Sequence, residues 1–90
     1  MANHKSAIKR AKQSELRRIR NRSRRTRMKH VIKGLEEALA ARNPEMAESR
    51  LREAASVIDK TACKGVIHRN HAARKISRLT HKVNALVPSA

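Results

Sequence analysis

The residues that could do chemistry in this 90-residue chain are concentrated in one run, "RNRSRRTR", at residues 20–27. Five arginines lie there beside Asn, Ser and Thr, with no apolar residue. Like charges three or four positions apart on a helix repel by roughly a few tenths of a kcal/mol per pair, and Glu15 is the sole acid among residues 1–33. A solvated charged face would leave this repulsion uncompensated, so the run predicts binding to a polyanion. We expect the run to be frayed or disordered in the free protein and helical among phosphates.

The kind of polyanion is narrowed by residues that the chain lacks. It has no Phe, Tyr or Trp, on which single-strand-binding modules stack bases. Contacts must therefore come from Arg and Lys to phosphates, with Asn, Ser, Thr, Gln and His reaching sugar hydroxyls. Charge on most sides of a helix suits a cleft between packed duplexes, which folded RNA supplies. A basic-leucine-zipper alternative needs leucine heptads beyond the basic part, and here Pro44 ends the helix after about two heptads.

Catalysis and metal binding have weaker support. Cys63, His68 and His71 are close enough in sequence to suggest zinc, but a fourth ligand is missing because His81 lies too far along the chain. We interpret Cys63 as a small buried or half-buried residue, and His68 and His71 as RNA contacts or surface residues. The carboxylates lie on helix surfaces without a paired apolar pocket. We therefore expect no enzyme activity, no cofactor, no metal site and no small-molecule substrate.

Charge is spread unevenly along the chain, whose formal net charge is +16. Residues 1–33 carry 13 basic residues and 1 acid, residues 34–59 carry 3 and 6, and residues 60–90 carry 7 and 0. Such a charge on one small domain needs a polyanionic partner, and we expect the acidic middle to face solvent. A single cysteine excludes an internal disulfide and suits a reducing compartment.

Targeting segments are the next question for so basic an N-terminus. No apolar run approaches membrane-spanning length and no signal-peptide core follows Met1, so we expect no membrane partner. The arginine-rich, acid-poor start also fits an organellar transit peptide.

The elements that must position these residues are helices. Apolar residues recur with helical spacing in three stripes, and nothing alternates with a period of two. We predict helices from about residue 5 to 41, from about 45 to 63 and from about 68 to 86. The stripes are Met28, Val31, Ile32, Leu35, Ala38 and Leu39; Ala47, Leu51, Ala54, Ala55, Ile58 and Ala62; and Ala72, Ile76, Leu79, Val83 and Leu86.

The breaks between the stripes carry capping residues. Asn43 is placed to cap the second helix with Pro44 in its first position. Gly65 is placed as the C-terminal cap of that helix, and Asn70 or a nearby residue opens the third. Gly34 inside the first stripe costs about 1 kcal/mol relative to Ala, and we expect the helix to continue through it.

These elements predict an all-α fold, an antiparallel three-helix bundle with a long basic N-terminal helix that overhangs it. At 1.5 Å per residue the first helix is roughly 55 Å long and the others roughly 28 Å. The single domain, residues 1–90, divides into a basic RNA-binding arm (1–27), the bundle (28–86) and a tail (87–90).

The apolar seam of the first helix becomes polar when it is followed toward the N-terminus, where Arg24, Asn21 and Arg17 take its place. Ile8, Leu16 and Ile19 lie on roughly the opposite side, so they cannot extend the same core. Counting back along the antiparallel pair places residue 63 beside residue 24. The turn that carries Lys64, His68 and Arg69 is therefore expected level with residues 20–27.

Three segments together resemble the bacterial small-subunit ribosomal protein S20 family: "MANHKSAIKRAKQSELRR", "NRSRRTRMK" and "DKTACKGVIHRNHAARKISRL". The resemblance covers essentially the whole chain, and the last segment is its most specific part. His4 and Gly34 are the positions that we do not match to the family pattern. Because the family-like residues begin directly after Met1, the resemblance argues against a transit peptide.

The resemblance implies a three-helix bundle that binds 16S ribosomal RNA directly and helps to organise it early in assembly of the 30S subunit. On matching positions it implies RNA contacts from Asn3, Lys5, Ser6, Lys9, Arg10, Arg17, Arg18, Asn21, Ser23, Arg24, Arg25, Arg27, Lys64, Gly65, His68, Asn70, Arg74, Ser77 and Arg78. The basic arm and the turn add Lys12, Arg20, Arg22 and Arg69 to the expected RNA-binding residues.

The expected function is that of a structural protein of the small ribosomal subunit, located on ribosomes in the cytoplasm. Its partners would be 16S ribosomal RNA and the 30S subunit. A nucleoid-type protein that binds nucleic acids without specificity is the alternative, and a marked preference for folded small-subunit RNA over duplex DNA would distinguish the two.

Overall fold

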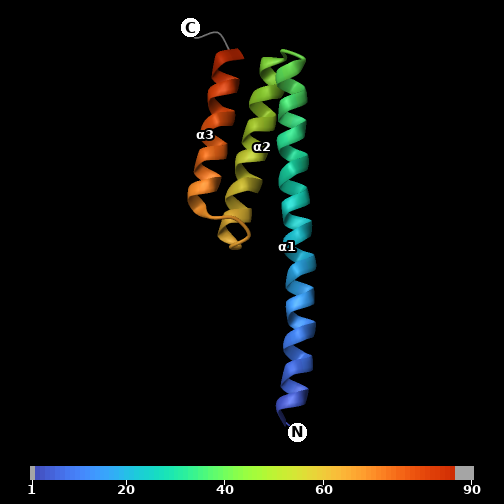
Figure 1. Ribbon diagram of the computed structural model, residues 1–90. Helices are drawn as coiled ribbons and strands as arrows, with labels where there is room; N and C mark the ends of the chain where they lie inside the picture. Colours follow the sequence, from blue (N-terminus) through green and yellow to red (C-terminus); the bar gives the residue numbers. More distant parts are fainter. Residues whose placement is uncertain (1, 87–90) are drawn as a thin grey trace.

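Three helices make up the fold in the computed structural model, which describes the backbone of residues 2–86 and the side chains of residues 4–86 (Figure 1). The helices are α1 (Ala2–Ala40), α2 (Pro44–Cys63) and α3 (Arg69–Leu86). Each boundary lies within about three residues of the one that periodicity predicts, and α1 continues through Gly34 as expected. The all-α class and the overhanging first helix are confirmed. The expected tail at 87–90 lies outside the described residues.

Both helix ends that lead into a turn close with a Schellman motif, in which a left-handed residue lets two backbone amides bond back to the last helical turn. At the end of α2 that residue is Gly65, with φ +75°, as the sequence predicts. At the end of α1 it is Arg42, with φ +55°. The amide of Arg42 donates to the Leu39 carbonyl at 3.1 Å, and the next amide donates to the Ala38 carbonyl at 3.3 Å.

Two side chains cap the helices that follow these turns. Asn43 accepts a hydrogen bond from the Met46 amide at 3.2 Å and Pro44 begins α2, as predicted. At the start of α3 the cap is His68, whose Nδ1 accepts from the Asn70 amide at 3.1 Å. The sequence predicted that Asn70 or a nearby residue opens this helix, and the capping residue is His68, two positions before Asn70.

The core is a thin aliphatic layer in which the three helices meet. Leu35, Ile58 and Val83, one from each helix, are its largest fully buried side chains. The predicted stripes are confirmed as buried or packed against that core, except for Ala55, which is only half-buried. The sequence stripes missed Val57, Thr61 and Val66, all of which are buried. The buried Thr61 hydroxyl has a hydrogen-bond partner within its own helix, because it donates to the Val57 carbonyl at 2.7 Å.

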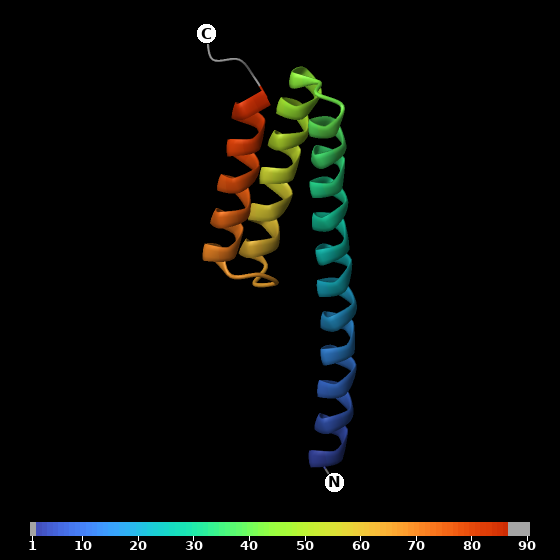
Figure 2. The ribbon, with the colours of Figure 1, turned by 45° about the horizontal axis from the view of Figure 1, so that its top comes forward.

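The arrangement is elongated, because the N-terminal half of α1 extends well past the ends of α2 and α3 (Figures 1 and 2). The Cα trace measures 70 × 22 × 13 Å along its principal axes. Within the bundle α2 packs closely against both other helices, whereas α1 and α3 touch at only a few places. The overhanging part, residues 2–23, has no helix beside it, and we call this part the arm from here on; residues 24–27 of the sequence-predicted arm lie beside the bundle.

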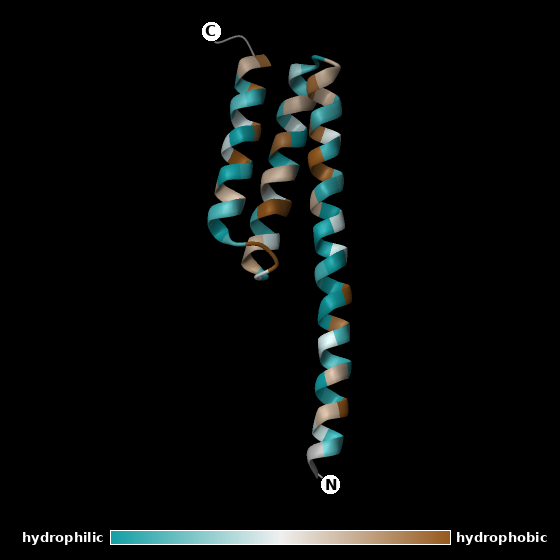
Figure 3. Ribbon diagram, in the orientation of Figure 1, coloured by the Kyte–Doolittle hydropathy of each residue, from teal (hydrophilic) through white to brown (hydrophobic). Residues whose placement is uncertain are grey.

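Hydropathy also differs between the arm and the part of α1 that lies in the bundle. Figure 3 shows apolar residues where the three helices face one another and a mostly hydrophilic arm. The exceptions in the arm are Ile8, Leu16 and Ile19, which are about half exposed. No helix within residues 2–86 is long and apolar enough to cross a membrane.

Candidate RNA-binding surface

The face of α1 that packs into the bundle becomes cationic as soon as the bundle ends. Met28 is the first buried residue of α1. One turn earlier the same face carries Arg24, which is half-buried and donates to the Asn21 side-chain oxygen at 3.4 Å. A further turn or two along, Arg17 and Ser14 continue the line. Beyond the end of the bundle, the side of α1 that faces the other helices within the bundle therefore carries guanidinium groups instead of apolar side chains.

The turn between α2 and α3 is brought level with these arginines, as counting along the antiparallel pair predicts. Lys64 and Gly65 line one groove together with Arg17, Arg20 and Arg24. On the other flank of α1, the Arg25 guanidinium donates to the Val66 carbonyl at 3.4 Å. Segments about 40 residues apart in sequence thus form one cationic surface around the junction of arm and bundle.

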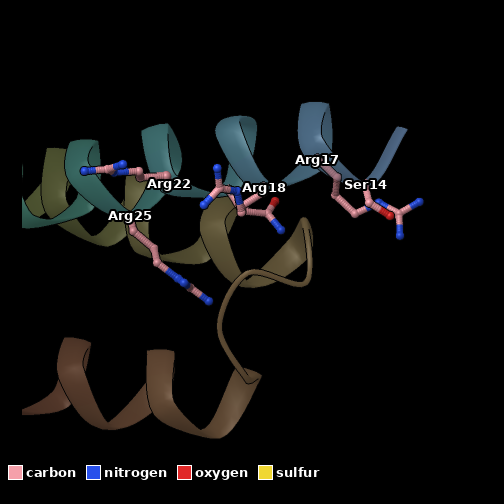
Figure 4. A pocket seen from close by; sticks show the side chains of 6 residues that line it. Ser14, Arg17, Arg18, Arg22 and Arg25 are labelled. Atoms are coloured by element: carbon pink, nitrogen blue, oxygen red, sulfur yellow. The ribbon is translucent and has the colours of Figure 1, made fainter. Parts of the chain in front are cut away.

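A second concavity lies on the α3 side of the same junction, and Figure 4 shows it from close by. Its lining consists of four arginines and two short polar residues: Ser14, Arg17, Arg18, Asn21, Arg22 and Arg25. Arg25 points across the gap toward the turn, while Arg17 and Ser14 lie beyond the end of the bundle (Figure 4). Guanidinium groups with an amide and a hydroxyl are suited to phosphates and ribose hydroxyls.

Intramolecular acids neutralise little of this charge. Among the described residues there are two ion pairs, Arg18 with Glu15 at 2.7 Å and Arg50 with Glu53 at 3.4 Å. The hydrogen bond and the charge of Arg18 lower the pKa of Glu15, and Glu15 in turn raises the pKa of Arg18. The remaining described arginines of the arm have no carboxylate within ion-pair distance.

The other residues expected to bind RNA fall into three groups. Lys5, Ser6, Lys9, Arg10 and Lys12 are exposed toward the free end of the arm, far from the bundle, and the side chain of Asn3 lies outside the described residues. Asn70, Arg74, Ser77, Arg78 and Arg69 are exposed on α3 and line none of the grooves beside the arm. Ser23 and Arg27 are exposed on α1 at the junction.

Two expectations about single side chains change with the structure. Cys63 is exposed rather than buried or half-buried, because it lies outside the buried face of α2, which ends with Thr61 and Ala62. His68 uses Nδ1 to cap α3, so an RNA contact from this residue would have to use Nε2. Among the described side chains no three His, Cys, Asp or Glu residues come together to hold a metal ion.

Three groove residues were missed by the sequence reasoning. Ser14 lines the concavity of Figure 4, and Gln13 and Leu16 line the groove that contains Lys64 and Gly65. Helical phase places Gln13 on the flank of the line through Arg17 and Arg24, and this signal could have found it. Leu16 was recognised as being outside the core, but nothing in the sequence indicated that the groove wall would reach it.

Comparisons with known proteins find related sequences over nearly the whole chain. The sequence profile of the family "Ribosomal protein S20" matches residues 2–84. "Small ribosomal subunit protein bS20" of Syntrophobacter fumaroxidans is 64% identical over 86 residues, covering 96% of this chain and 100% of that protein. Proteins of the same name from Desulfatibacillum aliphaticivorans and Desulfotalea psychrophila are 54% and 56% identical, covering 96% and 97% of this chain and 98% of each relative. The chain therefore belongs to the ribosomal protein S20 family.

Proposed function

We propose that this protein is a structural constituent of the small ribosomal subunit that binds 16S ribosomal RNA directly and stabilises its fold during 30S assembly. Membership of the ribosomal protein S20 family, and relatives named as small ribosomal subunit proteins over nearly the full chain, support the first part. On this proposal the protein works on ribosomes in the cytoplasm. The direct RNA contact and its mechanism rest on the surface described above.

One observation carries the proposal of direct binding: the arm and the α2–α3 turn form a continuous cationic surface at the point where α1 leaves its partner helices. Each arginine or lysine that meets a phosphate releases condensed counterions, which favours binding at low and moderate salt. Asn21, Ser14 and Gln13 lie among these cations and supply hydrogen bonds to ribose hydroxyls or base edges.

The shape favours folded RNA over a single duplex. Residues 4–20 of the arm are all exposed, and the arm extends far beyond the bundle (Figures 1 and 2), so it can enter a cleft between packed RNA helices and neutralise phosphates on more than one of them. The bundle then fixes the direction of the arm. The protein would act as an electrostatic brace between RNA segments that repel each other in its absence.

The test is a competition experiment at physiological salt. Labelled small-subunit ribosomal RNA is bound to the protein and challenged with unlabelled duplex DNA or unlabelled RNA of the same kind. We expect DNA to compete far less effectively, because non-specific electrostatic binding is weak at this salt while shape-specific contacts persist. Equal competition would contradict the proposal and favour the nucleoid-type alternative. Footprinting on naked small-subunit RNA would then show which RNA helices are protected.

A further inference from the structure

A cleft between α1 and α2, to which α3 contributes no lining residue, has the composition of a phosphate-binding site. It has a volume of about 230 Å³ and is lined by Arg24, Arg27, Val57, Lys60, Thr61 and Lys64. Two cations come from each side of the cleft, and its floor is formed by two buried side chains, Val57 and Thr61. Lys60 was not among the RNA-binding residues expected from the sequence.

The charges in this cleft have nothing within the described protein to balance them. None of its six lining residues is acidic, and the described carboxylate on the same side of α2, Glu53, is seven residues away and paired with Arg50. Lys60 and Lys64 are four positions apart and Arg24 and Arg27 three apart, so each pair repels within its own helix. An anion between the two pairs would remove both repulsions.

The floor of the cleft strengthens its attraction for an anion. Val57 and Thr61 are 6% and 3% exposed, and the Thr61 hydroxyl is already committed to the Val57 carbonyl at 2.7 Å. Water is therefore partly excluded below the charged groups, and charge–charge attraction is larger where the surroundings are less polar than water. The hydrogen-bond donors left for a ligand are those of the four cationic side chains.

We propose that this cleft binds backbone phosphates of the RNA and that Lys60 is one of the contacting residues. The cleft shares Arg24 and Lys64 with the groove beside the arm, so a phosphate backbone that follows the arm can continue onto the flank of α2 without leaving cationic surface. The RNA-binding surface then extends about one helical turn farther along the bundle than the α2–α3 turn alone would take it. The inference rests on the proposed function.

Another role for Lys60 predicts a different result. A cation in the last turn of a helix stabilises it by interacting with the helix dipole, and Lys60 lies in the last turn of α2. If this were its whole role, its loss would lower the melting temperature and leave the salt dependence of RNA binding unchanged. The experiment must therefore measure both quantities.

The test compares Lys60→Gln with Lys60→Arg and with Arg52→Gln, which removes the same charge from an exposed position about two turns earlier on α2 that lines none of the grooves described above. Affinity for small-subunit ribosomal RNA is measured between 50 and 200 mM salt. Since each phosphate contact adds roughly 0.7–0.9 to the salt slope, the wild-type affinity should fall about threefold more over this range than that of Lys60→Gln. Lys60→Arg should restore the wild-type slope, and Arg52→Gln should leave it unchanged.

Two results would overturn the inference. One is a slope for Lys60→Gln that equals the slope of the wild type, with or without a lower melting temperature. The other is an equal decrease of the salt slope in Lys60→Gln and Arg52→Gln, which would mean that RNA binding depends on the total charge of the protein and not on the cleft. In both cases a wild-type protein that still prefers small-subunit RNA over duplex DNA leaves the proposed function standing.

Discussion

Repulsion among the basic residues of the arm and of the junction, residues 24–27, predicts opposite effects of one substitution on folding and on binding. Between residues 2 and 27, seven pairs of basic residues are three or four positions apart, namely 5 and 9, 9 and 12, 17 and 20, 18 and 22, 20 and 24, 22 and 25, and 24 and 27. At roughly 0.2–0.5 kcal/mol each they oppose the helix by about 2 kcal/mol. The pair Glu15–Arg18 offsets only a small part, because both residues are exposed.

Arg20→Glu changes two of these repulsions into attractions, toward Arg17 and Arg24. The helical arm should gain about 1–2 kcal/mol. The three helices contain 39, 20 and 18 residues, 77 in all, and the arm, residues 2–23, contributes 22 of them. If the arm frays in the free wild-type protein, as we predict, the mean residue ellipticity of the protein at 222 nm should be lower by up to about 30% than in the RNA-bound form. Free Arg20→Glu should recover part of that difference.

The assay is far-UV circular dichroism of the free protein and of the complex after subtraction of the RNA spectrum, with Arg20→Gln as the matched control. Arg20→Gln removes the repulsion without adding attraction, so its helicity should lie between the other two. RNA binding should change in the reverse order, because Arg20→Gln loses one phosphate contact and Arg20→Glu adds repulsion from the backbone. Full helicity of the free wild-type arm, or no gain in Arg20→Glu, would refute the repulsion argument.

Three further predictions follow from the junction and the turns. The double variant Arg24→Gln/Arg25→Gln should have a salt slope of RNA affinity that is smaller by roughly two, measured between 50 and 200 mM salt as for Lys60. An unchanged slope would mean that both side chains face water. Gly65→Ala should lower the free energy of unfolding by about 1 kcal/mol in chemical denaturation, since a φ of +75° strains any residue with a Cβ. Arg42→Gly should raise the free energy of unfolding by a similar amount, because it removes the Cβ from a residue with positive φ. A change of the same sign in both variants would contradict this account. Glu15→Gln should raise RNA affinity at low salt, because the arm loses its one acid, and a weaker complex would show that the carboxylate orders the arm instead.

Helical periodicity predicted the helices and most of the core because both depend on local pattern. The stripes that contain Leu35, Ile58 and Val83 are the ones that the structure buries. The residues missed there are Val57 and Val66, whose burial depends on how the end of α2 packs against α1 and on the path of the turn. Neither is visible in the spacing of residues along a single helix.

The junction of arm and turn could be predicted from antiparallel counting, but its details could not. The contact of Arg25 with the Val66 carbonyl depends on a turn whose shape is set by Gly65. The left-handed Arg42 carries no sequence signal, because glycine is the residue that usually marks such a position. Lys60 was missed because its cationic neighbours come from a different helix and are distant in sequence.

The uneven charge and the elongated shape have a consequence for how the protein meets its partner. The acids at Glu36, Glu37, Glu45 and Glu48 lie near the turn between α1 and α2, at the opposite end of a 70 Å molecule from the arm. The protein is therefore an electric dipole as well as a polycation. In the electric field of a large RNA the protein experiences a torque that turns the arm toward the RNA before any contact forms. Productive encounters should then be selected by orientation during diffusion, and this selection should weaken as salt shortens the range of the field.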